Sequence, residues 1–212
     1  MSGVITGYTS LQTAVSDYLA RSDLTSFLPL FVQNFEERFY RDPLNVGAWM
    51  ESALNISNDA TTGLAAVPTD YLRLKNAYLS GILAPPLVRV SLEQLYARYP
   101  RSGTLSQPQY IARDGSNFVF GPVPSGSYTI VGTYYAKPVL LRNFASDAAA
   151  HWMIVNAPDL LLYGALLEAE PFLKNDQRLV LWKSAYDMAV DTYRRMQAEE
   201  DQSGSAIFSV AM

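Results

Sequence analysis

The stretch APDLLLYGALLEAEP, residues 157–171, has the apolar pattern of a helix but no polar face that would be exposed to solvent. At 3.6 residues per turn its apolar residues form two nearly opposite arcs. One arc holds Leu162, Leu166, Ala169 and, just beyond the stretch, Leu173, and the other holds Leu160, Gly164 and Leu167. A surface helix of a small soluble protein has one apolar stripe and one polar face. The second apolar side must therefore be covered by something that this stretch alone does not identify.

Helical patterns also occupy the start of the chain. Residues 11–20 carry an i, i+3, i+4, i+7 apolar stripe, for which Ser10 is the expected N-cap. The stretch LPLFVQNFEERFYRD, residues 28–42, places its phenylalanines on one side of a second helix. Its solvated side is expected to hold Glu36, Glu37, Arg38 and Arg41.

A long helix is predicted from Asn175 and Asp176, which cap it, to about residue 201. Its buried stripe is expected to consist of Leu179, Trp182, Tyr186, Ala189, Val190 and Tyr193. Its outer side carries two i, i+4 ion pairs, Lys183–Asp187 and Asp191–Arg195, each worth only about 0.2–0.5 kcal/mol.

Between about residues 46 and 138 the sequence becomes rich in glycine, proline, serine, asparagine and β-forming residues. Strands are predicted near residues 49–57 and 72–79, and the turn Ser80-Gly81 predicts a hairpin with another strand in 82–90. Ser91 caps a short helix, and three strands follow before Pro138. The last of them has bulky β-formers on both faces, so we expect it to be central or covered twice.

The order helices, strands, helices predicts an α+β fold, with a helical bundle from the N- and C-terminal helices and an inserted antiparallel β-rich region. The bundle is expected to comprise residues 1–43 and 145–202, and the β-rich insertion residues 44–144. Residues 203–212, SGSAIFSVAM, carry no charge and are expected to form an extended C-terminal tail.

Composition excludes several classes of function. A net charge of −4 and a pI near 5.0 argue against a general binder of nucleic acid or anionic membranes, which has a basic face. The chain has no cysteine, so disulfides, thiolate metal sites and thiol catalysis are absent. Residues 1–7 lack a signal-peptide pattern, and the longest apolar run is far shorter than the ~20 residues that a bilayer demands. We therefore expect a soluble, cytoplasmic protein without a membrane segment.

Few residues suggest catalysis. His151 is the only histidine, and packing at a helix start beside Trp152 explains it better than a catalytic role. The pairs Glu36-Glu37 and Glu199-Glu200 are expected on exposed helical faces or ends. Glu168 and Glu170 lie among apolar residues, where a carboxyl either has a raised pKa or pairs with a neighbouring arginine. The aromatic residues of the β-rich region are explained by core packing, since no basic groove accompanies them. The sequence thus predicts no enzyme, no cofactor and no metal.

Several blocks, in order, resemble the head-to-tail adaptor proteins of tailed bacteriophages. They are TSLQTAVSDYLARSDLTSFLPLFVQNFEERFYRD (9–42), VPTDYLRLKNAYLSG (67–81), SLEQL (91–95), FVFGPVPSGSYTIVGTYYAKPVLL (118–141) and WMIVNAPDLLLYGALLEAEPFLKNDQRLVLWKSAYDMAV (152–190). The resemblance runs from about Tyr8 to Met196 and so covers most of the chain.

The resemblance implies a structural virion protein. Such adaptors form a ring, usually of twelve copies, below the portal ring, where they lengthen the DNA channel and provide the surface on which tail or nozzle proteins assemble. The implied partners are further copies of this chain, the portal protein, the tail proteins and passing double-stranded DNA without tight binding. The implied location is the virion neck, after assembly in the host cytoplasm.

The ring suggests which residues contact partners. The two-sided helix packs on its own bundle, on the next subunit, or on both, and the uncharged tail docks on the portal or on an adjacent adaptor. The candidate contact residues are Leu160, Leu167, Glu168, Glu170, Arg194, Arg195, Ile207, Phe208 and Val210. Alternative functions are another phage ring component (a head-completion stopper or tail terminator), a carboxylate-based hydrolase, or a small-molecule binding module in the aromatic middle region.

Overall fold

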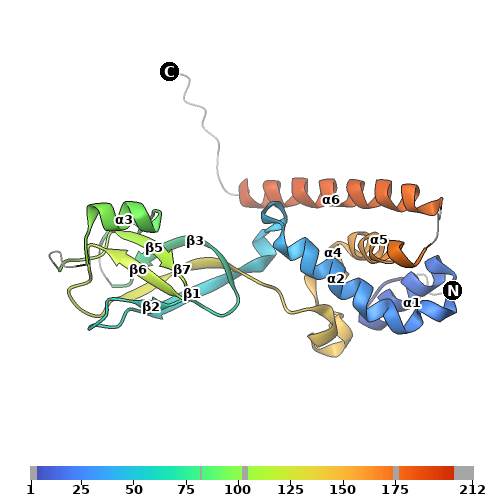
Figure 1. Cartoon of the computed structure of the whole chain (residues 1–212), viewed down its shortest axis with the longest axis horizontal. Coiled ribbons are helices and arrows are strands. Elements are labelled where there is room, and N and C mark those ends of the chain that lie inside the picture. Colours follow the sequence, from blue (N-terminus) through green and yellow to red (C-terminus); the bar gives the residue numbers. More distant parts are fainter. Residues whose placement is uncertain (1–3, 82, 102–104, 174–176, 203–212) are drawn as a thin grey trace, which may run out of the picture. The chain divides into compact units, whose positions relative to one another are not determined.

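A computed structural model describes residues 4–81, 83–101, 105–173 and 177–202. The chain divides into two compact units (Figure 1). Unit 1 consists of Met1–Trp49 with Pro138–Met212, and unit 2 consists of Met50–Lys137. Helices build unit 1, and two sheets with one helix build unit 2, so the predicted α+β class is confirmed. The unit boundaries lie six or seven residues inside the limits expected for the β-rich insertion.

Unit 1 is a bundle of helices joined by short 3₁₀ turns. The α-helices are α1 (Tyr8–Leu19), α2 (Leu28–Arg41), α4 (Trp152–Asn156), α5 (Pro158–Glu168) and α6 (Arg178–Gln202). The 3₁₀ turns are η1 (Ser22–Phe27), η2 (Pro43–Asn45), η3 (Ala48–Met50), η4 (Leu141–Asn143), η5 (Ser146–Ala148) and η6 (Glu170–Phe172). The caps predicted at Asn175 and Asp176 lie outside the described residues.

Helix α5, the apolar stretch, lies at the centre of this bundle. It contacts α1, α2, α4 and α6, and Leu160, Leu161 and Leu166 have no exposed surface. Gly164 allows the close approach of α2, because a Cβ at this position would overlap the ring of Phe35. Both apolar sides of α5 are therefore covered within one chain.

The start of α1 differs from the prediction. Its N-cap is Gly7, and Ser10, predicted to be the cap, lies in the first turn. The Ser10 hydroxyl reaches back and accepts hydrogen bonds from the backbone N–H groups of Thr6 (2.8 Å) and Gly7 (2.9 Å). Ser10 thus satisfies free amide groups at the helix start from inside the helix.

Unit 2 contains two sheets that enclose its core. The first has the antiparallel order β1 (Glu51–Ser57), β7 (Thr129–Ala136), β3 (Tyr71–Leu79). The second has the order β2 (Ala65–Ala66), β6 (Asn117–Gly121), β5 (Tyr110–Asp114), β4 (Val88–Arg89). The core includes Leu54, Leu74, Ile111, Phe118, Phe120 and Ile130, which come from both sheets. Strand β7 is central in its sheet, as predicted.

One predicted pairing in unit 2 is wrong. The chain does turn at Gly81, which has a φ of +71°, but β3 and β4 do not form a hairpin. Strand β3 pairs with β7, and β4 pairs in parallel with β5 in the other sheet. The short helix α3 (Leu92–Arg98) begins as predicted, with Ser91 and Gln94 forming a reciprocal capping box.

Candidate interaction surface

The candidate contact residues occupy different environments. Leu160 lies in the core of unit 1 with no exposed surface, so it cannot contact a partner in this fold. Leu167 and Glu168 are half-buried at the end of α5, and Glu170 is exposed in η6. Ile207, Phe208 and Val210, with the rest of the predicted tail, lie outside the described residues.

Glu168 is held by an arginine of its own chain. Its carboxylate oxygens lie 2.8 and 3.0 Å from the Arg38 guanidinium of α2, so the pairing with an arginine, one of the two alternatives for this carboxyl, is present. The Glu168 side chain is only 8% exposed. Burial raises its pKa, and the positive charge of Arg38 opposes that rise. The ion pair of Glu168 with Arg38 therefore holds the end of α5 against α2 within one chain.

The two candidate arginines of α6 differ in their contacts. Arg194 donates to Asp42 (2.8 Å) and to the Asn45 side chain (2.9 Å), so it fixes α6 to η2 within unit 1. Among the described residues, Arg195 pairs with Asp191, one turn away on α6, at 3.0 Å and in an exposed position. Of the two, Arg195 presents the more accessible charge.

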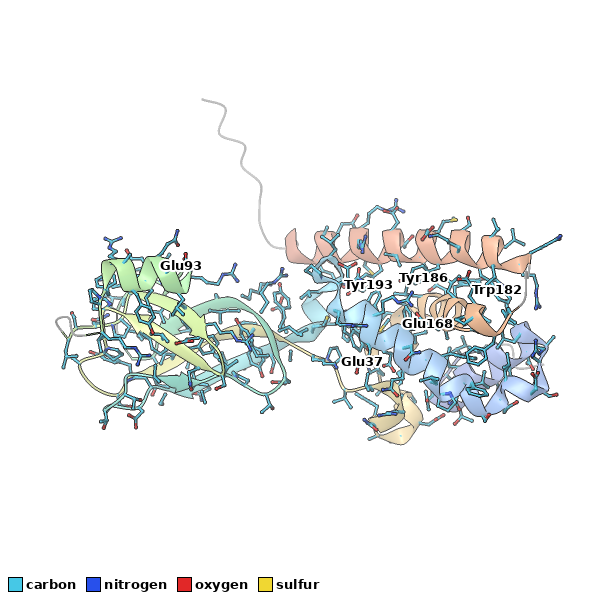
Figure 2. The ribbon with its side chains drawn as sticks, viewed as in Figure 1. Glu37, Glu93, Glu168, Trp182, Tyr186 and Tyr193 are labelled. Carbon is cyan, nitrogen blue, oxygen red and sulfur yellow. The ribbon has the colours of Figure 1, made fainter. Side chains whose placement is uncertain are left out.

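An open groove of about 670 Å³ lies along α6. One wall is the end of α5 with η6, through Leu167 and Glu170, and the other is a face of α6 that includes Val180, Lys183, Asp187, Met188 and Asp191. We call this the α6 groove. Figure 2 shows that Trp182, Tyr186 and Tyr193 project from α6 toward the helices beneath it.

Large apolar residues on α6 remain uncovered. Val180, Leu181 and Met188 are 75%, 70% and 69% exposed. The sequence assigned this side of the helix to ion pairs, and both predicted pairs are present, with Lys183 2.8 Å from Asp187. The apolar residues between them were missed, although the i, i+8 spacing of Val180 and Met188 was visible. The helix with a second, uncovered apolar side is therefore α6 rather than α5.

Glu36 corrects another expectation. It was predicted on the solvated side of α2, but it is 1% exposed. Its carboxyl accepts hydrogen bonds from the Leu141 N–H (2.9 Å) and the Tyr40 hydroxyl (3.3 Å). Burial raises the pKa of Glu36 to about 7, although these hydrogen bonds favour the charged form. The 3₁₀ turn η4, which contains Leu141, covers this side of α2. The periodicity of α2 alone cannot reveal this contact.

His151 has a structural position. It is the N-cap of α4, and its Nδ1 accepts a hydrogen bond from the Met153 N–H at 3.3 Å. The rings of Phe144 and Trp49 lie edge-on to it, with centroids 5.2 and 5.8 Å away. Burial lowers the pKa of His151, which keeps the ring neutral and suited to accept this bond. The prediction that it starts a helix is confirmed.

Within the described ranges, no cluster of three or more histidine, aspartate or glutamate side chains could hold a metal ion. Across the same part of the chain, no helix is both long and apolar enough to cross a membrane.

An uncovered apolar groove beside a complete core is typical of a protein that assembles with other proteins. A family model described as SU10 adaptor protein matches residues 6–208, which is most of the chain. This chain therefore belongs to the SU10 adaptor protein family, a family of phage head-to-tail adaptors, and the resemblance found in the sequence is confirmed. No curated protein matches the chain.

Proposed function

We propose that this phage adaptor forms a ring, with twelve copies, below the portal ring of the capsid. The ring extends the DNA channel and presents the surface to which tail or nozzle proteins attach. It belongs to the virion neck and assembles in the host cytoplasm. Family membership supports the adaptor role, and the single structural observation that supports a ring is the uncovered α6 groove.

The groove supports assembly for an energetic reason. Val180 and Met188 line the groove and leave most of their surface in water in a single chain, as does the adjacent Leu181 of α6. Burying a large apolar side chain returns about 1.5–3 kcal/mol, so a neighbour that covers this face gains substantially. A closed ring gives every copy two neighbours through one heterologous interface and covers the groove in all copies at once.

The charge balance suits a channel that DNA passes through. The chain has a net charge of −4, and a protein that grips duplex DNA does so with lysine and arginine on the phosphates. We therefore expect no tight binding of duplex DNA at physiological salt, and a measured tight affinity would count against this part of the proposal.

A phage with an amber codon in this gene tests the proposal. In a non-suppressing host we expect DNA-packaged heads without tails, because the tail has no surface on which to assemble. The protein supplied from a plasmid should restore tailed virions. Normally tailed, infectious particles in the absence of the protein would refute the adaptor role.

Residues 203–212 form a second, separable part of the proposal. Their uncharged sequence includes Ile207, Phe208 and Val210, which favours docking on the portal or on an adjacent adaptor. Ordering ten residues costs roughly 1–2 kcal/mol each. The docking of a single tail is therefore only marginally stable. In a ring, each tail docks next to tails that are already bound, and the high effective concentration strengthens its binding. Deleting residues 203–212 should leave the subunit folded but weaken assembly on the portal. Unchanged assembly would refute the proposed docking of these residues.

A further inference from the structure

Unit 1 has a second uncovered surface, on α2. Leu30, Asn34, Glu37 and Arg41 follow one stripe of this helix at i, i+4, i+7 and i+11. Leu30 is 43% exposed, Asn34 and Arg41 are exposed, and Glu37 is half-buried. Arg142 of η4 lies beside the stripe, where it donates to the Gln33 side chain at 2.6 Å. We call the surface formed by Leu30, Asn34, Arg41 and Arg142 the α2 face.

The α2 face and the α6 groove have nearly the same length. The groove wall on α6 runs from Leu179 to Asp191, thirteen residues, and the α2 stripe runs from Leu30 to Arg41, twelve residues. At 1.5 Å per residue both are about 17 Å long. A helix that presents the α2 stripe can therefore occupy the groove along its whole length.

Their chemistry is complementary in one direction. Along α6 the groove begins with Leu179 and Val180, continues past Lys183 and ends with the carboxylates of Asp187 and Asp191. The exposed Glu170 lies on the opposite wall. Along α2 the stripe begins with Leu30 and ends with Arg41. A parallel alignment thus places apolar on apolar at one end and arginine on carboxylate at the other.

The balance of charge favours the same pairing. The residues that line the α6 groove include three carboxylates and one lysine. Asp187 pairs with Lys183 and Asp191 with Arg195, both in exposed positions on α6, and Glu170 forms no ion pair with any described residue. The α2 face carries two arginines, Arg41 and Arg142, beside one carboxylate, Glu37. Arg41 donates to the Glu37 carbonyl and Arg142 to the Gln33 side chain, and neither arginine forms an ion pair within the described ranges. Opposite charges across a contact fix partner and register.

The two surfaces lie on different sides of unit 1. The side of α2 that faces α6 is marked by Phe35 and Phe39, whose rings meet Tyr186 and Tyr193 at 6.0 and 5.2 Å. At 100° per residue the α2 stripe lies well away from those rings, and Figure 2 shows Glu37 on the side of α2 away from α6. Distinct, complementary patches on different sides are what a heterologous ring interface requires.

We infer that the α2 face of one copy occupies the α6 groove of the next copy, with Leu30 toward Val180 and Arg41 toward Asp187 and Asp191. This inference rests on the proposed function, because it names the contact that closes the proposed ring. It gives Asp187 and Asp191, which pair with Lys183 and Arg195 on their own helix, an additional basic partner in the next copy of this chain.

A charge exchange tests the pairing. Asp191→Lys and Arg41→Glu should each weaken ring assembly on the portal about tenfold, because like charges then meet across the interface. The variant with both substitutions should recover, and an equal mixture of the two single variants should recover as a ring that alternates them. Glu93→Lys on α3, an exposed acid of unit 2, is the matched control and should assemble as the parent does. The readout is the number of copies on each portal ring, by native mass spectrometry, with thermal unfolding to verify each fold.

The apolar end is tested with matched valines. Val180→Asp lies in the first turn of α6, where a carboxylate is compatible with the helix, and it should reduce assembly about tenfold. Val88→Asp, at an exposed valine of unit 2, should not. If the parent forms the ring but Val180→Asp and Asp191→Lys leave it unchanged, this interface is wrong and the proposed function stands. Losses in both charge variants without recovery in their combination overturn the pairing of the two faces. A parent chain that forms no ring overturns the proposed function and this inference together.

Discussion

Replacing the buried Glu36 by glutamine should stabilise unit 1 at alkaline pH and change little at acidic pH. Glutamine has nearly the shape of the protonated acid, and its side-chain oxygen can still accept hydrogen bonds from the Leu141 N–H and the Tyr40 hydroxyl. It cannot ionise in the core. The substitution therefore removes only the penalty of holding a carboxylate away from water.

The sign and size follow from the pKa of Glu36, which burial raises from 4.5 to about 7. Between these values the unfolded chain has already lost this proton while the folded chain retains it. Stability from Glu36 is therefore full below about pH 4.5, falls as the pH rises toward 7, and stays low above it. This difference between the pKa of Glu36 in the unfolded and in the folded chain corresponds to about 3 kcal/mol of unfolding free energy. Glu36→Gln should thus exceed the parent by about 3 kcal/mol at pH 8 and match it near pH 4.5.

Tryptophan fluorescence during urea unfolding is the appropriate assay. All three tryptophans, at positions 49, 152 and 182, belong to unit 1, so the signal reports the unit that contains Glu36. Titrations from pH 4.5 to 8 give the difference between variant and parent, in which the other ionisable groups cancel. Glu37→Gln, at the adjacent half-buried position, is the control and should lack the 3 kcal/mol rise. A Glu36→Gln difference that does not vary with pH would show that the folded chain does not hold Glu36 protonated.

Two further substitutions test the packing of α5. Gly164→Ala should destabilise unit 1 by about 1–3 kcal/mol in urea unfolding, because its Cβ would overlap the Phe35 ring; Gly126→Ala, where a Cβ would meet nothing within 4 Å, is the control, and equal effects would contradict the close approach. Arg38→Met should cost about 1–3 kcal/mol at pH 7, because the buried Glu168 carboxylate loses its cation. That cost should shrink at pH 4, where Glu168 is protonated, and a cost independent of pH would argue that Arg38 acts through packing alone.

The sequence predicted most elements but not which surfaces they cover. The apolar periodicity of α5 was sufficient to show that both its sides are buried, yet it could not identify the covering partner. The structure supplies four helices of the same chain. In α6 the ion pairs Lys183–Asp187 and Asp191–Arg195 predicted a solvated face correctly, and the same pattern concealed the exposed Val180 and Met188.

Errors arose where the deciding contact is distant in the chain. The turn at Gly81 is real, but β3 takes its hydrogen-bond partner from β7, about fifty residues later, and a local turn signal carries no information on that pairing. Glu36 is likewise buried by a segment more than one hundred residues away, which donates the Leu141 N–H. Helical periodicity places a residue on a face of the helix, and the tertiary contacts then decide whether that face is exposed to solvent.

Native mass spectrometry of the protein alone, and mixed with the portal ring encoded in the same genome, tests most directly whether this adaptor assembles as a ring on the portal. We predict portal rings that carry a fixed complement of twelve adaptor copies. A chain that stays monomeric and leaves the mass of the portal unchanged would rule out the ring.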